Sequence, residues 1–411
     1  MIKSLFYVGV LMFVFRGLAL GQILTQEDSL STGLIRRQQQ TVISGYGEAR
    51  YSIDTKRQSA EANLKRVVLF IGHKFSKNIS FFSEMELENA LVSGQASDEG
   101  NGTGSISMEQ AFLKFNINPT MYIVAGLFVP RIGYINENHL PTTFNGVDRP
   151  FLEEQIIPST WREVGVGLYG QVKTIPGLNY TLAIANGLNS KKFSGDAGIA
   201  EGRQLGQASE GLNLGVNGSI LYYINRFRLQ MSGYIGGSTA LDKRRADSLQ
   251  LNSGPFGNRV VLGEANAQYS HQGITARTIA TIVTVNHADD INRAFANKTP
   301  SMMYGMYGEL GYDIFYKKFH GTKALIIFGR YEYVNLNAEI PSNGIENAAG
   351  TKHYLIGGLT YKPTRGIAIK ADYVRRMTGD FNPALIVTPF PQQQFYYKDN
   401  GFVNLGVAYN F

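Results

Sequence analysis

The sequence contains no cysteine, a single tryptophan and only six scattered histidines among its 411 residues. The lack of cysteine excludes disulfides, thiolate metal sites and a cysteine nucleophile. No histidine pair has the H-E-x-x-H spacing of a zinc protease, and the G-x-S-x-G segment of serine hydrolases is missing. We therefore expect that the protein is not an enzyme and has no catalytic residue, metal site or cofactor.

Long apolar runs are also missing. The longest, residues 5–15, has about 11 residues, whereas a membrane-spanning helix needs about 20. With Lys3 before it and the small-residue segment 19–21 after it, this run has the features of a secretory signal peptide. We expect three regions: a signal peptide at 1–21, a polar periplasmic stretch at 22–40 and one outer-membrane domain at 41–411.

The charge balance excludes another class of function. The net charge is +7, and it falls to +5 when Lys3 and Arg16 leave with the signal peptide, because 37 basic residues then face 32 acidic ones. The basic residues are scattered among carboxylates rather than gathered in a patch, so we expect no nucleic-acid binding. An excess this small suits a weak preference for anions at most.

What the sequence does have is a series of segments in which apolar and polar residues alternate. In the last ten residues, five apolar side chains fall on one face, with small or polar residues between them. Because successive side chains of a strand point to opposite faces, this pattern predicts a strand with one apolar face. About sixteen strands are predicted in this way, near residues 41–54, 64–76, 79–92, 106–117, 121–133, 162–172, 178–188, 211–224, 227–238, 258–272, 274–286, 301–315, 323–336, 351–363, 366–378 and 402–411.

The connections between these segments alternate in length. Those after even-numbered strands are short, as at 77–78 and 225–226, and those after odd-numbered strands are long and rich in glycine and polar residues, as at 189–210 and 239–257. Short turns at one end and long loops at the other are typical of outer-membrane barrels, in which every backbone group is paired. The sequence thus predicts an all-β fold, a transmembrane antiparallel β-barrel of about sixteen strands. We place it in lipid, in the outer membrane of a Gram-negative bacterium.

Charged residues recur on the strand faces opposite the apolar ones. A basic side chain at the middle of a bilayer costs about 2–4 kcal/mol, so these residues cannot face lipid. We expect ten of them to line the barrel interior: Glu84, Glu86, Glu88, Lys114, Arg228, Glu264, Arg330, Glu332, Lys370 and Asp372. The alternative is that these rows pair with one another and plug the barrel, although about sixteen strands enclose more space than side chains fill.

One long connection differs from the others. Residues 134–160 contain Pro150 and Pro158 within a mixture of aromatic and aliphatic residues and are followed by Trp161. This composition favours an infolded constriction loop, with an external loop packed on its neighbours as the alternative. The residues that we expect to contact permeating solutes are Arg131, Asp148, Arg149, Glu153, Glu154 and Arg162.

Four segments of the sequence resemble the phosphate-selective porins O and P, namely residues 43–49, 144–151, 158–167 and 404–411. The resemblance extends over most of the chain that follows the predicted signal peptide. It implies a sixteen-stranded outer-membrane channel, commonly a homotrimer, with an inward loop at the position described above. It also implies that the barrel-assembly machinery recognises the last strand through Phe411.

Phosphate selectivity does not carry over directly. The phosphate-selective members hold anions with a ladder of arginines and lysines, and guanidinium groups match phosphate in a bidentate geometry. In this sequence, the arginines of the constriction region are interspersed with carboxylates, including Glu163, which would pair with them and cancel their field. We therefore expect a passive channel for small hydrophilic solutes or ions, with a phosphate or anion preference as the narrower hypothesis. The alternative is a non-conducting barrel that serves adhesion or structure through its surface loops.

Overall fold

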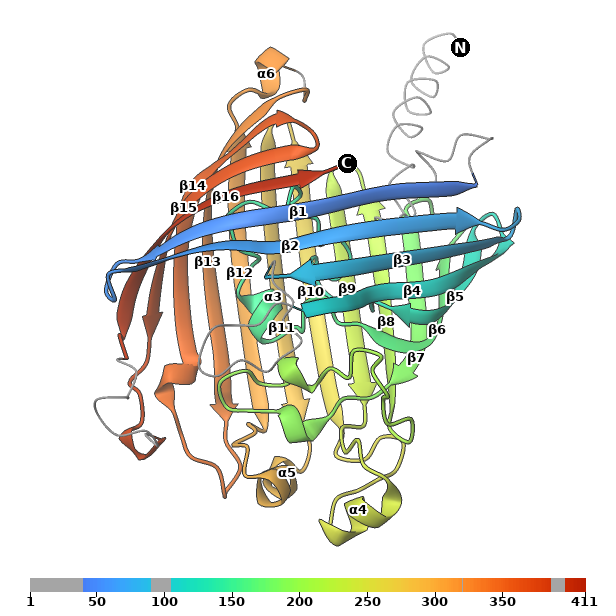
Figure 1. Ribbon diagram of the computed structural model, residues 1–411, viewed down its shortest axis with the longest axis vertical. Helices are drawn as coiled ribbons and strands as arrows, with labels where there is room; N and C mark the ends of the chain where they lie inside the picture. The colour runs from blue at the N-terminus through green and yellow to red at the C-terminus, as the bar shows by residue number, and fades with distance from the viewer. Residues whose placement is uncertain (1–39, 90–104, 320, 386–395) are drawn as a thin grey trace, which may run out of the picture.

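The computed structural model describes residues 40–89, 105–319, 321–385 and 396–411, which fold into a closed antiparallel barrel (Figure 1). Each strand pairs with its neighbours in the sequence, and β1 pairs with β16 to close the ring. The described strands are β1 (Thr41–Asp54), β2 (Ser59–Lys74), β3 (Ile79–Glu88), β4 (Ser105–Asn118), β5 (Met121–Phe128), β6 (Glu163–Gln171), β7 (Leu178–Asn186), β8 (Leu214–Ile224), β9 (Phe227–Gly236), β10 (Val260–His271), β11 (Ile274–Val285), β12 (Met302–Asp313), β13 (Ala324–Glu339), β14 (Thr351–Thr364), β15 (Ile367–Thr378) and β16 (Asp399–Asn410). The predicted sixteen-stranded barrel is confirmed.

Short helices lie in the connections. They are α3 (Leu152–Gln155), α4 (Lys243–Ser248), α5 (Ala288–Phe295) and α6 (Tyr316–Phe319), with 3-10 turns η2 (Ser190–Lys192), η3 (Ala200–Gly202), η4 (Ala348–Gly350) and η5 (Pro383–Leu385). In the described part of the chain, no helix is both long and apolar enough to span a membrane. The long connections that carry α4 and α5 lie at the opposite end of the barrel from α6 and the C-terminus (Figure 1). The predicted signal peptide and all but the last residue of the N-terminal stretch lie outside the described residues.

Two strand boundaries lie five residues from their predicted positions. β2 begins at Ser59 rather than at residue 64, because β1 and β2 are joined by a tight turn in which the Asp54 carboxylate accepts the amide N–H groups of Lys56 and Arg57. This turn after an odd-numbered strand is therefore short, unlike the long loops at the same end. β5 ends at Phe128 rather than at residue 133. Pro130 follows two residues later, and because proline has no N–H group it cannot donate a hydrogen bond to a neighbouring strand.

The outer face of the barrel is apolar. Along β6 and β13, the side chains of Val164, Val166 and Ile327 are 47%, 48% and 49% exposed, whereas the residues that alternate with them are buried or half-buried. The same alternation recurs on the other strands, so an apolar surface surrounds the molecule. Such a surface suits the hydrocarbon of a bilayer, and it places the chain in the outer membrane as a barrel.

Two β-bulges change which residues point inward. The β1–β2 register shifts between Glu48 and Ala49, so Lys65 has no partner in the ladder and its side chain turns toward the interior. The β3–β4 register shifts between Glu84 and Met85, and here Glu109 is the extra residue. Each bulge brings a charged side chain to the inner face beside one that already points there.

The ring closes where β1 meets β16. Nine residue pairs join these strands, from Tyr46 opposite Asn410 to Asp54 opposite Phe402. Beyond them, Gly45 and Phe411 exchange two backbone hydrogen bonds of 3.1 and 2.9 Å. The Phe411 ring covers Gly45, where a Cβ would lie 2.9 Å from Cζ of the ring and 2.6 Å from the carbonyl oxygen of Val68. Glycine at this position therefore allows the aromatic ring to lie over the closing seam.

Candidate functional site

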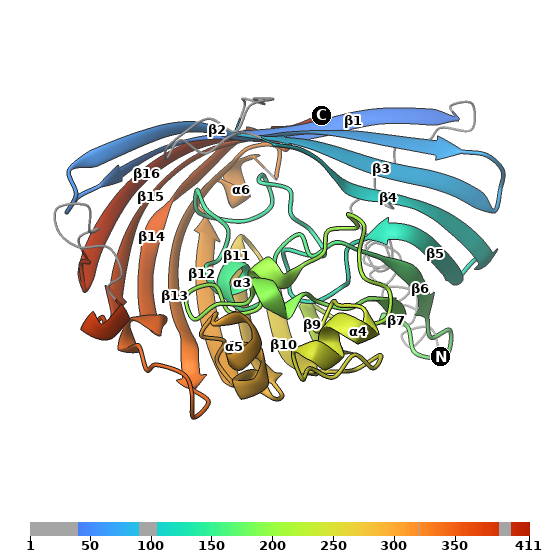
Figure 2. The ribbon, with the colours of Figure 1, turned by 60° about the horizontal axis from the view of Figure 1, so that its bottom comes forward.

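The connection between β5 and β6 folds into the barrel. We call residues 129–162 the inner loop, and its helix α3 lies within the ring of strands (Figure 2). The loop buries an apolar side whose members are all 0% exposed: Ile132, Leu152, Ile156, Ile157 and Trp161. Two glycines with positive φ, Gly133 at 78° and Gly146 at 83°, allow the turns that direct the chain inward. The infolded loop predicted from the prolines and apolar residues is thus present.

The apolar side of the inner loop packs against the strands from β9 to β14. Their inward-facing residues include Leu262, Met303 and Val334, which belong to the same buried cluster as the loop residues. Gly305 on β12 makes room for α3, because a Cβ there would lie 2.5 Å from Cδ1 of Leu152. This wall of the barrel therefore combines a packed apolar surface with inward-facing charged residues such as Glu264 and Arg330.

The Glu153 carboxylate fixes the fold of the inner loop from within. Oε2 accepts the backbone N–H groups of Tyr134 and Ile135 at 2.6 and 2.8 Å, and Oε1 accepts the Tyr307 hydroxyl of β12 at 2.9 Å. Burial raises the pKa of the Glu153 carboxyl to about 7, against the effect of these hydrogen bonds. Its neighbour Glu154 is half-buried. Glu153, predicted to contact solutes, instead holds the loop together.

The polar side of the inner loop faces β1 and β2. Oδ1 of Asp148 accepts hydrogen bonds from Nη1 of Arg50 at 2.9 Å and from Nζ of Lys65 at 3.1 Å. Burial alone would raise the pKa of Asp148, but these two cations hold it below its usual range. Asp148 therefore presents a paired charge to the interior.

Strands β12 to β16 also hold the inner loop. The Val147 N–H donates to Oδ2 of Asp372 at 2.6 Å, and the Leu152 N–H donates to Oε2 of Glu332 at 2.8 Å. Nζ of Lys370 lies 3.9 Å from the centre of the Phe144 ring. Three residues predicted to line the pore thus contact the loop directly.

Arg330 belongs to the same wall. It pairs with Glu309 at 3.1 Å and with Glu332 at 2.9 Å, and all three side chains are almost fully buried. Removing one partner of such a buried ion pair is strongly destabilising, because it leaves an uncompensated charge in the interior. Arg330 therefore keeps two carboxylates in place behind the inner loop.

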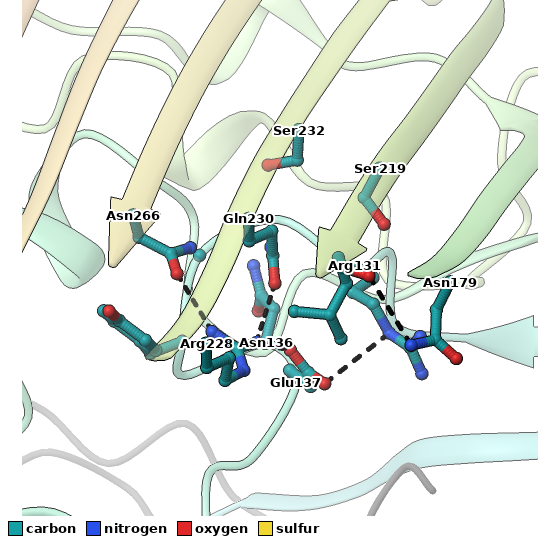
Figure 3. A network of polar contacts seen from close by, with 12 residues as sticks. Arg131, Asn136, Glu137, Asn179, Ser219, Arg228, Gln230, Ser232 and Asn266 are labelled. Carbon is teal, nitrogen blue, oxygen red and sulfur yellow. Dashed lines mark hydrogen bonds and ion pairs between the residues drawn. The ribbon is translucent and has the colours of Figure 1, made fainter. Parts of the chain in front are cut away.

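A second polar network lies on the wall formed by β7 to β10 (Figure 3). Arg228 donates to Oδ1 of Asn266 at 2.9 Å and to Oε1 of Gln230 at 2.7 Å, and it pairs with Glu137 of the inner loop. Glu137 also lies 3.9 Å from Nε of Arg131. The acidic residue joins two arginines that come from different segments.

A third network lies on the wall formed by β1 to β4. Arg66 pairs with Glu48 at 2.9 Å and with Glu86 at 3.2 Å, so one guanidinium joins β1, β2 and β3. Arg162, at the end of the inner loop, lies 3.8 Å from Glu86 and 3.6 Å from Glu109. These contacts are the pairing of arginines with carboxylates that the sequence suggested, although the partners of Arg162 lie on the wall and not in the loop.

The ten residues predicted to line the interior all lie on the inner face. Seven are buried, and three are half-buried, namely Glu88, Lys114 and Arg228. Of the six predicted solute contacts, four are buried and two are half-buried. The side chains of Arg131, Arg149, Glu153 and Arg162 are all less than 9% exposed, whereas Asp148 and Glu154 are half-buried. Asp148 lines an open space in the interior.

That open space is a cavity of about 440 Å³ between the inner loop and the wall formed by β1, β2 and β14 to β16. Its basic lining residues are Arg50, Arg57, Lys352 and Arg376, and its acidic ones are Asp54, Glu61 and Asp148. Phe151 stacks on Tyr354 at its edge, with ring centres 4.2 Å apart. The cavity therefore offers small solutes a charged and partly aromatic surface.

Several residues of the interior were not singled out from the sequence. Arg50, Lys352 and Arg376 share the inward parity of strands that the sequence did predict, so extending the alternation to them would have found them. Glu109 could not be found in this way, because strict alternation places it on the face opposite Gln110 and only the bulge turns it inward. The loop partners of the wall residues depend on tertiary contacts and have no signal in the sequence.

No family model matches the chain. Over 346 residues it is 32% identical to an uncharacterized protein of Aquifex aeolicus (strain VF5), and the alignment covers 81% of this chain and 75% of that protein.

Among solved structures, the barrel is similar to Salmonella typhi OmpF in complex with daunomycin, with a TM-score of 0.54, 12% identity, and coverage of 90% of this chain and 97% of that one. It is also similar to an anion-selective porin from Comamonas acidovorans, with a TM-score of 0.51, 10% identity, and coverage of 90% and 99%. The outer membrane channel DcaP of Acinetobacter baumannii is similar as well, with a TM-score of 0.52, 13% identity, and coverage of 90% of this chain and 97% of that one. The fold is that of outer-membrane porins.

Proposed function

This chain belongs to the same family as the Aquifex aeolicus protein and has the porin fold, and on that premise we propose that it forms a passive, water-filled channel through the outer membrane. The observation that carries the proposal is the charged cavity of about 440 Å³ between the inner loop and the wall. Beside the wall formed by β1, β2 and β14 to β16, the inner loop leaves this space open. Small hydrophilic solutes and ions would pass along that wall, and the inner loop would set the width of the passage.

The charges of the cavity support a weak preference for anions. Asp148 is neutralised by Arg50 and Lys65, whereas Lys352 and Arg376 form no ion pair with any described residue. An unpaired guanidinium and an unpaired ammonium attract anions, phosphate among them. This is a shorter basic surface than the arginine ladder of phosphate-selective porins, so we infer a general channel with a modest anion bias.

The lack of cysteine makes a direct test possible. In the variant S52C, a thiol lies in the cavity, and in I53C the neighbouring thiol lies on the outer face, where Ile53 is 36% exposed. We expect stable current steps in a planar bilayer, and a charged methanethiosulfonate reagent should reduce the conductance of S52C only. An equal effect on both variants, or none on S52C, would show that solutes do not pass through this cavity.

One observation favours a second function, a non-conducting barrel used for adhesion or structure. The inner loop contacts the walls on several sides, and much of the interior on the β9 to β14 side is packed with apolar residues. A barrel filled in this way could act through its external loops alone. The absence of current steps from folded protein would favour this function over a channel.

Assembly adds two further proposals. We infer a homotrimer in outer-membrane lipid, on the basis of the resemblance to trimeric porins, and the apolar outer surface is compatible with either lipid or protein neighbours. We also infer that the barrel-assembly machinery recognises the last strand through Phe411, whose side chain is 69% exposed.

A further inference from the structure

Beneath the inner loop, three side chains bring metal-type ligand atoms together. Nε2 of His139, in the loop, lies 3.4 Å from Oε2 of Glu84 on β3 and 3.7 Å from Oε2 of Glu109 on β4. One ligand atom from each residue fits within 4.8 Å of the others. The three residues are 3%, 1% and 0% exposed, so the cluster is closed to bulk solvent.

The imidazole of His139 lacks the partners that a buried ring needs. Neither Nδ1 nor Nε2 has a hydrogen-bond partner, and Nε2 points at the two carboxylates without hydrogen-bond geometry. Buried polar groups are nearly always hydrogen-bonded, so an exception needs an explanation such as an ion between the groups. An ion bound by all three residues would satisfy Nε2 and both carboxylates at once.

Neighbouring side chains orient the two carboxylates. Nε2 of Gln110 donates to Oε2 of Glu84 at 2.8 Å, and the Tyr46 hydroxyl donates to Oε2 of Glu109 at 2.9 Å. Each carboxylate oxygen retains a second lone pair for a ligand bond. Hydrogen bonds of this kind fix the direction of metal ligands and are part of most metal sites.

The surrounding charges leave room for a cation. The groups that face the cluster from β1 to β4 and the inner loop are the carboxylates of Glu48, Glu84, Glu86 and Glu109 and the guanidinium groups of Arg66, Arg149 and Arg162. With a neutral imidazole, these groups carry one excess negative charge. Arg162 lies on the Oε1 side of Glu109, at 3.6 Å, whereas His139 lies on the Oε2 side. The arginines therefore do not occupy the space between the three ligand atoms.

We propose that Glu84, Glu109 and His139 bind one divalent transition-metal ion of the zinc type, which fixes the inner loop to β3 and β4. In a tetrahedral zinc site with bonds of about 2.0–2.1 Å, neighbouring ligand atoms are about 3.3–3.4 Å apart, close to the two distances observed here. An imidazole with two carboxylates suits zinc and its neighbours in the first transition row. Calcium and magnesium prefer sets made of oxygen alone.

The site exists only in the folded barrel. Its ligands come from two strands and a loop, and Glu109 faces inward because of the β-bulge. An ion that binds the folded state alone stabilises it, and the gain rises with the logarithm of the ion concentration once that concentration exceeds the dissociation constant. Because an imidazole must be neutral to bind a metal ion, protons compete with the ion and binding tightens as the pH rises.

The test uses the folded protein at pH 8 after treatment with a chelator, with ZnCl₂ or CoCl₂ as the probe. We expect one zinc per chain by elemental analysis, a cobalt absorption band in the visible range and a higher thermal unfolding temperature with zinc. The variants H139Q and E84Q should weaken binding at least about 10–100-fold, by analogy with the loss of supporting groups at metal sites. The control is H287Q, in the exposed group of His287, Asp289 and Asp290, and it should leave all three readouts unchanged.

Each other result overturns the proposal. Less than stoichiometric zinc in wild-type protein at saturating ZnCl₂, or a cobalt band that survives in H139Q, would show that these residues do not bind the ion. Binding lost in H287Q and kept in H139Q would assign the ion to the exposed group. Heat-modifiable migration reports whether each variant is folded. If H139Q and E84Q do not fold, the unfolding temperature of wild-type protein decides, because no shift with zinc contradicts the proposal.

Discussion

The guanidinium of Arg50 on β1 donates a 2.9 Å hydrogen bond to the Asp148 carboxylate of the inner loop. The loop leaves the wall at β5 and packs its apolar side on the β9 to β14 wall, yet through Asp148 it reaches β1 and, by Lys65, β2. One chain segment thus joins opposite sides of the barrel. The charge at this contact lies at the edge of the cavity, so it bears directly on the ions that would pass.

Replacing Asp148 with asparagine should increase the preference of the channel for anions. The change removes the negative charge that both cations contact, so Lys65 would lose its ion-pair partner and Arg50 would keep only Glu61, 3.5 Å away, which adds positive charge beside the cavity. In a KCl gradient, the reversal potential should move by several millivolts toward the chloride equilibrium potential. The control is D399N, because Asp399 pairs with Arg375 outside the lumen and is half-exposed. A reversal potential equal to that of wild type would show that Asp148 does not face the permeation path.

Replacing Arg376 with glutamine should have the opposite effect. Arg376 lines the cavity, its guanidinium carbon lies 5.3 Å from the centre of the Phe402 ring, and its Nε has no hydrogen-bond partner. Removal of this unpaired charge should lower the chloride-to-potassium permeability ratio several-fold at low ionic strength and less at high salt, where charges are screened. The adjacent Arg375 points outward, so R375Q should keep the wild-type ratio. An unchanged ratio in R376Q would place the permeating ions elsewhere.

The sequence predicted the barrel well because strand alternation is a local property. The period of two in β16 follows from side chains that must face lipid on one side, and no tertiary partner is needed to recognise it. The inner loop was also predictable, since Pro150 and Pro158 with buried aliphatic residues do not suit an external loop.

The roles of individual side chains were less predictable. The sequence predicts that Glu153 contacts solutes, but its carboxylate accepts hydrogen bonds from two amides of the inner loop and from the Tyr307 hydroxyl of β12. None of these partners is a near neighbour of Glu153 in the sequence. Glu109 was missed because a bulge breaks the alternation on which the prediction rested. Local periodicity fixes which face a strand presents, whereas pairing across the lumen depends on how the loop packs.

Loss of a buried carboxylate should change how stability depends on pH. The pKa of Glu153 is raised by burial from 4.5 to about 7, so the folded state binds its proton more tightly than the unfolded state does. The free energy of unfolding should therefore fall as the pH rises from about 4.5 to about 7, by at most about 3 kcal/mol from this group. In E153Q this contribution is absent, so the difference between wild type and variant in urea unfolding should shrink or reverse over that range.

The matched control for this prediction is E154Q, which removes a half-buried carboxylate from the same helical turn. The pH dependence should follow Glu153 and not Glu154. A difference between wild type and E153Q that stays constant from pH 4.5 to pH 8 would contradict a raised pKa. In that case the hydrogen bonds from Tyr134 and Ile135 would outweigh the cost of burying the charge.

Replacing Phe411 with asparagine should lower the fraction of protein that assembles into the closed barrel. The residue exchanges two backbone hydrogen bonds with Gly45, and its ring covers the β1–β16 seam, where the first and last strands must meet. Such a contact between distant parts of the chain forms late and depends on every intermediate pairing, so its loss should slow closure more than it weakens the finished barrel. We expect several-fold less heat-modifiable protein after refolding into detergent or lipid. F411Y, which keeps the aromatic ring, should assemble like wild type, and equal yields from all three proteins would show that the ring has no part in closing the barrel.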